Sequence, residues 1–103
     1  MHKTITELCK EAHETAVSKG WYDDPQGIPT HIALMHSELS EALEAYRSLS
    51  GQEMRTRLAE EFADTCIRIF DTCAYFGLDL ESAIYAKMER NKRRQYKHGG
   101  KRI

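Results

Sequence analysis

The sequence predicts an all-α fold, and three observations lead to this prediction. Apolar residues recur at intervals of three and four in four separate segments, which is the spacing of one face of a helix. Gly, Pro or a Ser-Gly pair interrupts the chain between these segments. The strand pattern, period-two alternation with β-branched enrichment, is absent. At 103 residues the chain is long enough for one domain, which we expect over residues 1–96, with a basic C-terminal tail at 97–103.

The first helix is expected over residues 4–19. Thr4 and Glu7 have the spacing of a capping box, in which each side chain accepts a hydrogen bond from the other residue's backbone N–H. Gly20 ends this helix, and the following loop carries Trp21 and Tyr22. Such aromatic residues either stack on the base of a ligand or hold the loop against the body of the protein. For Trp21 the two roles are equally expected, whereas for Tyr22 the structural role is favoured.

The second helix is expected over residues 30–49, with Thr30 as its N-cap, and the third over residues 52–76. The third helix is apolar on more than one side, which predicts burial both in the core and in a subunit interface. A polar stripe runs through it at steps of three and four, where charged groups need partners or a metal ion. This stripe consists of Glu61, Asp64, Arg68 and Asp71.

The fourth helix is expected over residues 80–96, after a break at Gly77 and with Asp79 as its N-cap. Lys87, Asn91 and Arg94 lie at i, i+4 and i+7, on one face of this helix. A solvated basic face near a helix C-terminus is the simpler interpretation. The alternative is a phosphate-binding face, with Arg94 as a planar fork and Lys87 as a point charge.

Charge is distributed unevenly along the chain. Residues 1–86 carry 7 Lys and Arg against 15 Asp and Glu, a net charge of −8, whereas residues 87–103 carry 8 against 1, a net charge of +7. An acidic body followed by a basic segment indicates an anionic ligand that needs both a bridging cation and direct Lys or Arg contacts.

The three cysteines are odd in number and form no Cys-x-x-Cys motif, so we expect reduced core residues and no zinc site. Cys66 and Cys73 are seven residues apart, on the same apolar stripe of the third helix. No apolar run is long enough to span a bilayer, and no N-terminal secretion signal is present. We therefore expect a cytoplasmic protein with no membrane partner.

Two acidic pairs dominate the second and third helices: Glu38 with Glu41, and Glu61 with Asp64. Residues three apart lie on one helix face, so an antiparallel packing of the two helices would bring four carboxylates together. Such a group needs a cation, and ligands that are all oxygen favour Mg²⁺, with Mn²⁺ as the second choice. Solvated surface is the simpler interpretation, because Asp and Glu are mostly exposed. The position of both pairs within apolar segments favours the metal site.

This pattern resembles a known family. Glu38-x-x-Glu41, a spacer of 19 residues and Glu61-x-x-Asp64 are similar to the metal-binding signature of the MazG-like all-α nucleoside triphosphate pyrophosphohydrolases. The similarity extends along nearly the whole chain. It includes Lys19-Gly20-Trp21 in the first loop, residues 36–45 in the second helix, Lys87-x-x-x-Asn91-x-x-Arg94, and the segment His98-Gly99-Gly100-Lys101. One departure is Ser37, at a position where many members carry an acidic residue.

The resemblance implies a four-helix bundle-like MazG-type fold, assembled as a homodimer or tetramer. It also implies a Mg²⁺-dependent hydrolase that converts a nucleoside triphosphate to the monophosphate and pyrophosphate, for nucleotide-pool cleansing. Glu38, Glu41, Glu61 and Asp64 would hold the metal and carry catalysis. Lys87, Asn91 and Arg94 would bind the phosphates, and Trp21 the base. With Ser37 in place of an acidic residue, Glu41 or Glu60 would take the proton from water.

Three alternatives remain. The first is a phosphoribosyl-ATP pyrophosphohydrolase, whose related helical fold carries similar acidic pairs. The second is a helical nucleic-acid-binding module that uses the basic tail, although the acidic body repels a phosphate backbone and makes nucleic acid an unfavoured partner. The third is an inactive helical oligomer whose four carboxylates lie on the surface.

Overall fold

The structure, a computed structural model, describes residues 2–94, and the regular secondary structure in this range is entirely helical. This confirms the all-α prediction. The helices are α1 (Ile5–Ser18), α2 (Ile28–Ser48), α3 (Gly51–Phe76) and α4 (Leu80–Arg93). The end of the predicted domain at residues 95–96 and the predicted tail at 97–103 lie outside the described residues.

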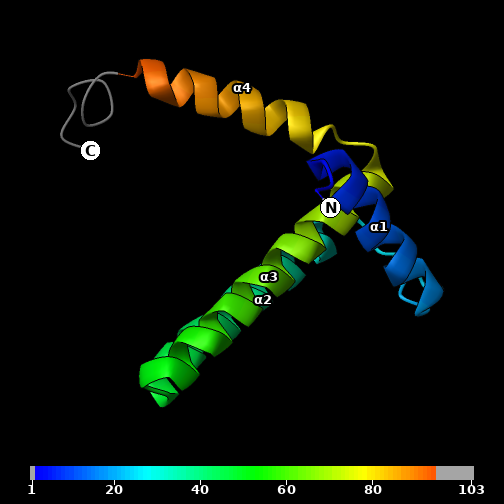
Figure 1. The fold of residues 1–103 in the computed structure, drawn as a ribbon. Coiled ribbons are helices and arrows are strands. Elements are labelled where there is room, and N and C mark those ends of the chain that lie inside the picture. Colours follow the sequence, from blue (N-terminus) through cyan, green and yellow to red (C-terminus); the bar gives the residue numbers. More distant parts are fainter. Residues whose placement is uncertain (1, 95–103) are drawn as a thin grey trace.

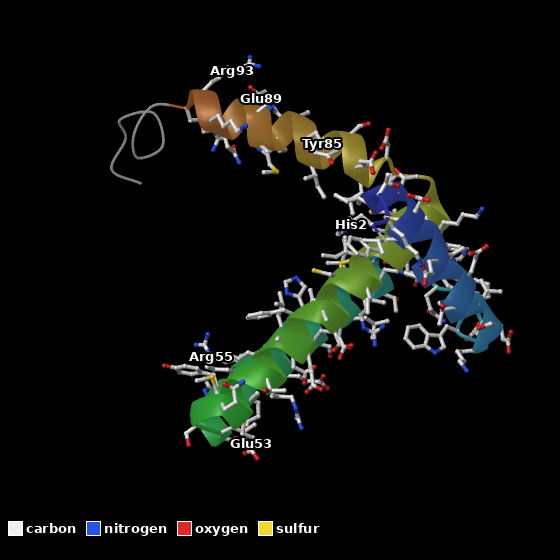
Figure 2. The ribbon with its side chains drawn as sticks, in the orientation of Figure 1. His2, Glu53, Arg55, Tyr85, Glu89 and Arg93 are labelled. Atoms are coloured by element: carbon white, nitrogen blue, oxygen red, sulfur yellow. The ribbon has the colours of Figure 1, made fainter. Side chains whose placement is uncertain are left out.

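Helices α2 and α3 form a long antiparallel hairpin (Figure 1). Helix α1 packs on α3 near the open end of this hairpin, whereas α4 projects away and makes few contacts, chiefly with α1. The described chain therefore does not form a four-helix bundle by itself. Helix α4 contains no buried residue, and Figure 2 shows Tyr85, Glu89 and Arg93 extending from it into open space.

The start and end of α1 follow from local side-chain chemistry, as predicted. Glu7 N donates to Thr4 Oγ1 at 3.1 Å and Thr4 N donates to Glu7 Oε1 at 2.8 Å, which completes the capping box. Gly20 adopts a φ of 84°, a left-handed conformation that favours glycine. Trp21 N then donates to Ala16 O at 3.1 Å, so the chain turns sharply into the loop that carries Trp21 and Tyr22.

The predicted start of α2 is wrong by two residues. Thr30 is not the N-cap, because the helix already begins at Ile28, after an extended Gly27. Pro29 lies in the first turn, where its fixed φ suits a helix and its missing N–H removes no hydrogen bond.

The junction between α3 and α4 is as predicted. Gly77 ends α3 with a φ of 67°, and Asp79 caps α4 by accepting a hydrogen bond from Ser82 N at 3.1 Å. At the start of α4, Glu81 Oε1 accepts a hydrogen bond from Thr6 N at 3.1 Å, which ties the first turn of α4 to α1.

The apolar core of the described chain is small. Its buried apolar residues are Cys9, Ala16, Ala42, Ala45 and Cys73. Cys66 is exposed, so the prediction that it belongs to the core is wrong for the single chain. Phe62, one turn away on the same side of α3, is 51% exposed. The second apolar side predicted for α3 is therefore present but uncovered. None of the helices described is both long and apolar enough to cross a membrane.

Candidate metal and nucleotide site

Three of the four predicted carboxylates come together between α2 and α3. Glu38, Glu61 and Asp64 each offer one oxygen, and these oxygens lie within 4.8 Å of one another. Glu38 and Glu61 are each only 9% exposed, while Asp64 is at the open side of the group. The packing of the two helices thus brings together three of the four predicted carboxylates, and we call these three residues the carboxylate cluster.

Glu41, the fourth predicted carboxylate, is exposed and does not belong to the carboxylate cluster. Burial raises the pKa of Glu61, and the negative charges of Glu41, Asp64 and Glu38 raise it further. Glu41 is therefore close enough to act on Glu61 electrostatically. Four acidic groups share this region, and they oppose each other's ionisation in the absence of a cation.

Arg68 provides a positive charge at the edge of the carboxylate cluster. Its Nε donates to Glu38 Oε1 at 2.8 Å, and the two side chains are 25% and 11% exposed. The same guanidinium lies over the ring of Trp21, 5.3 Å from its centroid, in a cation–π contact. Arg68 therefore links the carboxylate cluster on α2 and α3 to the loop that follows α1.

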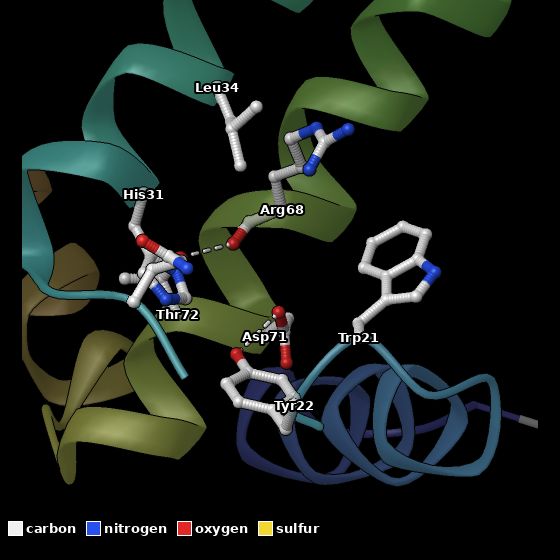
Figure 3. A pocket seen from close by; sticks show the side chains of 8 residues that line it. Trp21, Tyr22, His31, Leu34, Arg68, Asp71 and Thr72 are labelled. Carbon is white, nitrogen blue, oxygen red and sulfur yellow. Dashed lines mark hydrogen bonds between the residues drawn. The ribbon is translucent and has the colours of Figure 1, made fainter. Parts of the chain in front are cut away.

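A cavity of about 210 Å³ lies beside Arg68, between this loop and helices α2 and α3 (Figure 3). We call it the Trp21 cavity. It is lined by Trp21, Tyr22, Gln26, His31, Leu34, Arg68, Asp71 and Thr72. Trp21 is 55% exposed, and its ring forms part of the lining of this space.

Asp71 organises the floor of the Trp21 cavity. It is 5% exposed and accepts two hydrogen bonds, from His13 Nδ1 to Oδ1 at 2.9 Å and from the Tyr22 hydroxyl to Oδ2 at 2.8 Å. Burial and the bond to Asp71 raise the pKa of Tyr22 far above its usual value. Tyr22 thus fastens the loop to α3, which agrees with the structural role favoured for it.

His31 and Thr72 form a second polar pair in the wall of the Trp21 cavity. Thr72 Oγ1 donates to the carbonyl oxygen of Arg68 at 2.7 Å. His31 Nδ1 lies 2.9 Å from the same hydroxyl oxygen. Because the hydroxyl's only proton points to Arg68, His31 Nδ1 must carry the proton of this second bond.

The structure does not bring the predicted phosphate-binding residues to the carboxylate cluster within one chain. Lys87, Asn91 and Arg94 are all exposed at α4, which projects away from α2 and α3. Arg94 lies just beyond the last helical residue, with an extended backbone, so it does not continue the helical face of the other two. Ser37, the departure from the family pattern, is also exposed.

Arg68, Asp71 and His31 were not among the predicted site residues. The polar stripe on the third helix did signal Arg68 and Asp71, since it required partners for charges on that helix. The partners themselves, Glu38 and His13, lie 30 and 58 residues away in sequence. His31 carried no signal, because an isolated histidine next to a helix start is common.

The chain matches no protein-family model, no curated protein and no solved structure among those compared. The resemblance to the MazG-like pyrophosphohydrolases therefore stays a prediction.

Proposed function

We propose that this protein is a Mg²⁺-dependent nucleoside triphosphate pyrophosphohydrolase of the MazG-like type. It converts a nucleoside triphosphate to the monophosphate and pyrophosphate, in the service of nucleotide-pool cleansing. The observation that carries the proposal is the convergence of Glu38, Glu61 and Asp64 within 4.8 Å, next to Arg68, which also lines a cavity with an aromatic wall.

The carboxylate cluster fits Mg²⁺ by its donor chemistry. Its ligand atoms are all carboxylate oxygens, which Mg²⁺ and Mn²⁺ prefer. Burial and then the neighbouring carboxylates raise the pKa of Glu61, and a bound cation would relieve the repulsion between these like charges. When bound, Mg²⁺ supplies positive charge that stabilises the attacked phosphate and makes water more acidic.

The remaining steps fall to side chains of the chain itself. Glu41 does not belong to the cluster but its charge raises the pKa of Glu61, and we assign it to accept the proton from the attacking water. Arg68 holds Glu38 in position. The ring of Trp21 stacks on the base and thereby orients the substrate against the cluster.

A second copy of the chain completes the site in this proposal. Helix α2 carries an uncovered apolar stripe, with exposed fractions of 46–61%, formed by Ile32, Leu39, Leu43 and Tyr46. An exposed stripe of this kind favours association. Helix α4 is basic at its end and contains no buried residue, so in a homodimer or tetramer it could reach the acidic face of a partner. Lys87, Asn91 and Arg94 would then meet the phosphates there.

The test is a substrate panel. Common nucleoside triphosphates are incubated with and without Mg²⁺, and the products are resolved for the wild type, Glu61→Gln and the control Glu14→Gln, which changes an exposed carboxylate on α1. We expect monophosphate and pyrophosphate, dependent on Mg²⁺, lost in Glu61→Gln and retained in the control. Formation of diphosphate and phosphate would contradict the assigned point of attack. No turnover, together with no Mg²⁺-induced rise in melting temperature, would overturn the proposal.

A further inference from the structure

Three polar side chains that line the Trp21 cavity, those of Tyr22, Thr72 and Gln26, already donate their protons within the protein. The Tyr22 hydroxyl donates to Asp71, and the Thr72 hydroxyl donates to the Arg68 carbonyl. Gln26 Nε2 donates to Asp24 O at 3.1 Å and to Asp24 Oδ2 at 3.3 Å. These side chains therefore have only oxygen lone pairs left to offer a ligand.

His31 adds a nitrogen acceptor to this set. Since Nδ1 carries the proton that goes to Thr72, Nε2 of the neutral ring carries a lone pair. Within residues 2–94, Nε2 has no hydrogen-bond partner. Every fully shielded side-chain nitrogen or oxygen in this range does have a partner, so Nε2 is not fully shielded. His31 is 9% exposed, and its side chain lines the Trp21 cavity.

Asp71 is the strongest acceptor in the cavity wall. Each of its oxygens accepts one hydrogen bond, from His13 or from Tyr22, and each can accept a second. Its charge has no Lys or Arg partner within 4.0 Å in the described chain, because Arg68 pairs with Glu38 instead. A carboxylate that is 5% exposed gains most from a ligand that donates N–H groups to it.

From these contacts we infer that the Trp21 cavity selects bases that carry an exocyclic amino group, namely cytosine, adenine or guanine, over their oxo counterparts. This inference rests on the proposed function and names its substrate class. An amino group donates to Asp71 and His31, which supply acceptors. An oxo group in the same place sets one acceptor against another and brings no donor to the remaining lone pairs of Asp71.

The position of the cavity suits a base whose phosphates lie at the carboxylate cluster. Asp71 follows Asp64 by two turns on the same side of α3, which separates their backbones by about 10 Å along the helix. This spacing is comparable with the separation of a base from the phosphates of its own nucleotide. Trp21 and Leu34 supply apolar walls for the ring faces (Figure 3), and Arg68 lines the cavity while its Nε donates to Glu38 of the cluster.

The inference is tested with matched substrate pairs that differ by one amino-to-oxo exchange: CTP with UTP, and ATP with ITP. We expect kcat/KM to favour the amino member of each pair by at least about tenfold, as for a site built to bond N–H donors. Asp71→Asn, which exchanges an acceptor for a donor, is expected to reduce this ratio. Tyr22→Phe is the matched control, because it disturbs the same network but leaves the acceptors of Asp71 in place.

Failure of the inference is distinguishable from failure of the proposed function. Turnover with equal kcat/KM for both members of a pair would overturn the base selectivity and leave the hydrolase in place. If no nucleotide is hydrolysed, the fluorescence of Trp21, the only tryptophan in the chain, is followed during titration with cytidine and with uridine. Preferential binding of cytidine would then support the pocket, whereas equal binding or no response to either nucleoside would overturn it.

Discussion

Arg68 Nε donates to Glu38 Oε1 across 2.8 Å, and this contact joins the two halves of the candidate site. Glu38 belongs to the carboxylate cluster, and the guanidinium of Arg68 lies over Trp21 at the mouth of the neighbouring cavity. The pair is largely shielded from water, so it interacts more strongly than an ion pair on the surface. It offsets part of the negative charge that Glu61 and Asp64 add to the same region.

Replacing Arg68 with Gln is expected to lower the free energy of unfolding by about 1–3 kcal/mol without metal at neutral pH. The loss follows because Glu38 would keep its charge beside two other carboxylates without a cationic partner. Urea denaturation measures this difference. Arg93→Gln is the control, because it breaks an exposed pair with Glu89 at 3.9 Å that should contribute less than about 1 kcal/mol. Equal losses in both variants would contradict a special role for the Glu38–Arg68 pair.

Glu61→Gln is expected to stabilise the metal-free protein at neutral pH while abolishing hydrolysis. Burial and the neighbouring carboxylates raise the pKa of Glu61 above its usual value of 4.5, so the folded protein holds this proton more tightly than the unfolded chain. The stability that this protonation contributes is full below pH 4.5 and is lost as the pH rises through the raised pKa.

The advantage of Glu61→Gln should therefore shrink as the pH is lowered towards 4.5 and disappear below it. Melting temperatures of both proteins, measured without metal across this range, test the prediction. Glu14→Gln, at an exposed position on α1, should show no comparable trend. A Glu61→Gln variant that is less stable than the wild type at neutral pH would indicate that the carboxylate has a favourable partner in the protein.

Tyr22→Phe is expected to lower the free energy of unfolding by about 1–2 kcal/mol at neutral pH, because it removes the 2.8 Å bond to the carboxylate of Asp71. The pKa of Tyr22 is raised above its usual value of 10.0, so the stability linked to its proton is full below that pH. It is lost as the pH rises through the raised pKa. Stability above pH 10.0 should thus fall more steeply in the wild type than in the variant.

Ultraviolet titration of the tyrosines, combined with urea denaturation at neutral and alkaline pH, measures both effects. Tyr85→Phe provides the control, because Tyr85 is 63% exposed and makes no hydrogen bond in the described chain. If Tyr22 ionised together with the exposed tyrosines, the bond to Asp71 would not persist in solution.

Features that depend on residues close together in the sequence could be predicted from it. The ends of α1 and α3 depend on a capping box and on glycines within a few residues, and their prediction is confirmed. The carboxylate cluster was predictable because a helix face fixes each acidic pair and a short connection makes α2 and α3 antiparallel. The prediction of Thr30 as the N-cap was wrong because Pro29, directly before it, fits the first turn of a helix.

Features that depend on distant partners were not predictable in the same way. The polar stripe of α3 required partners for Arg68 and Asp71, but helical spacing carries no information about which residues of α1 and α2 meet them. The prediction that Cys66 is buried was wrong for a related reason. An apolar side chain on a helix indicates that something covers it, and in the single chain nothing does.

Cys66 offers a direct test of the proposed homo-oligomer. It lies one turn from Phe62 on the uncovered side of α3, so a second copy packed there would shield it from thiol reagents. Cys9 and Cys73 are buried, and burial raises the pKa of both thiols, so they should react slowly in any assembly. We expect slow alkylation of all three cysteines at concentrations where sedimentation shows an oligomer.

Leu43→Glu places a charge in the apolar stripe of α2 and should dissociate the oligomer, with faster alkylation of Cys66 alone. Val17→Glu is the matched control, because Val17 on α1 is 50% exposed and Leu43 is 51% exposed, but Val17 lies outside the stripe. Mass spectrometry of the alkylated peptides separates the three thiols. Rapid alkylation of Cys66 in the wild type, with a monomer by sedimentation, would show that the apolar stripe has no second copy on it. In that case no second copy would be present to bring its Lys87, Asn91 and Arg94 to the phosphates.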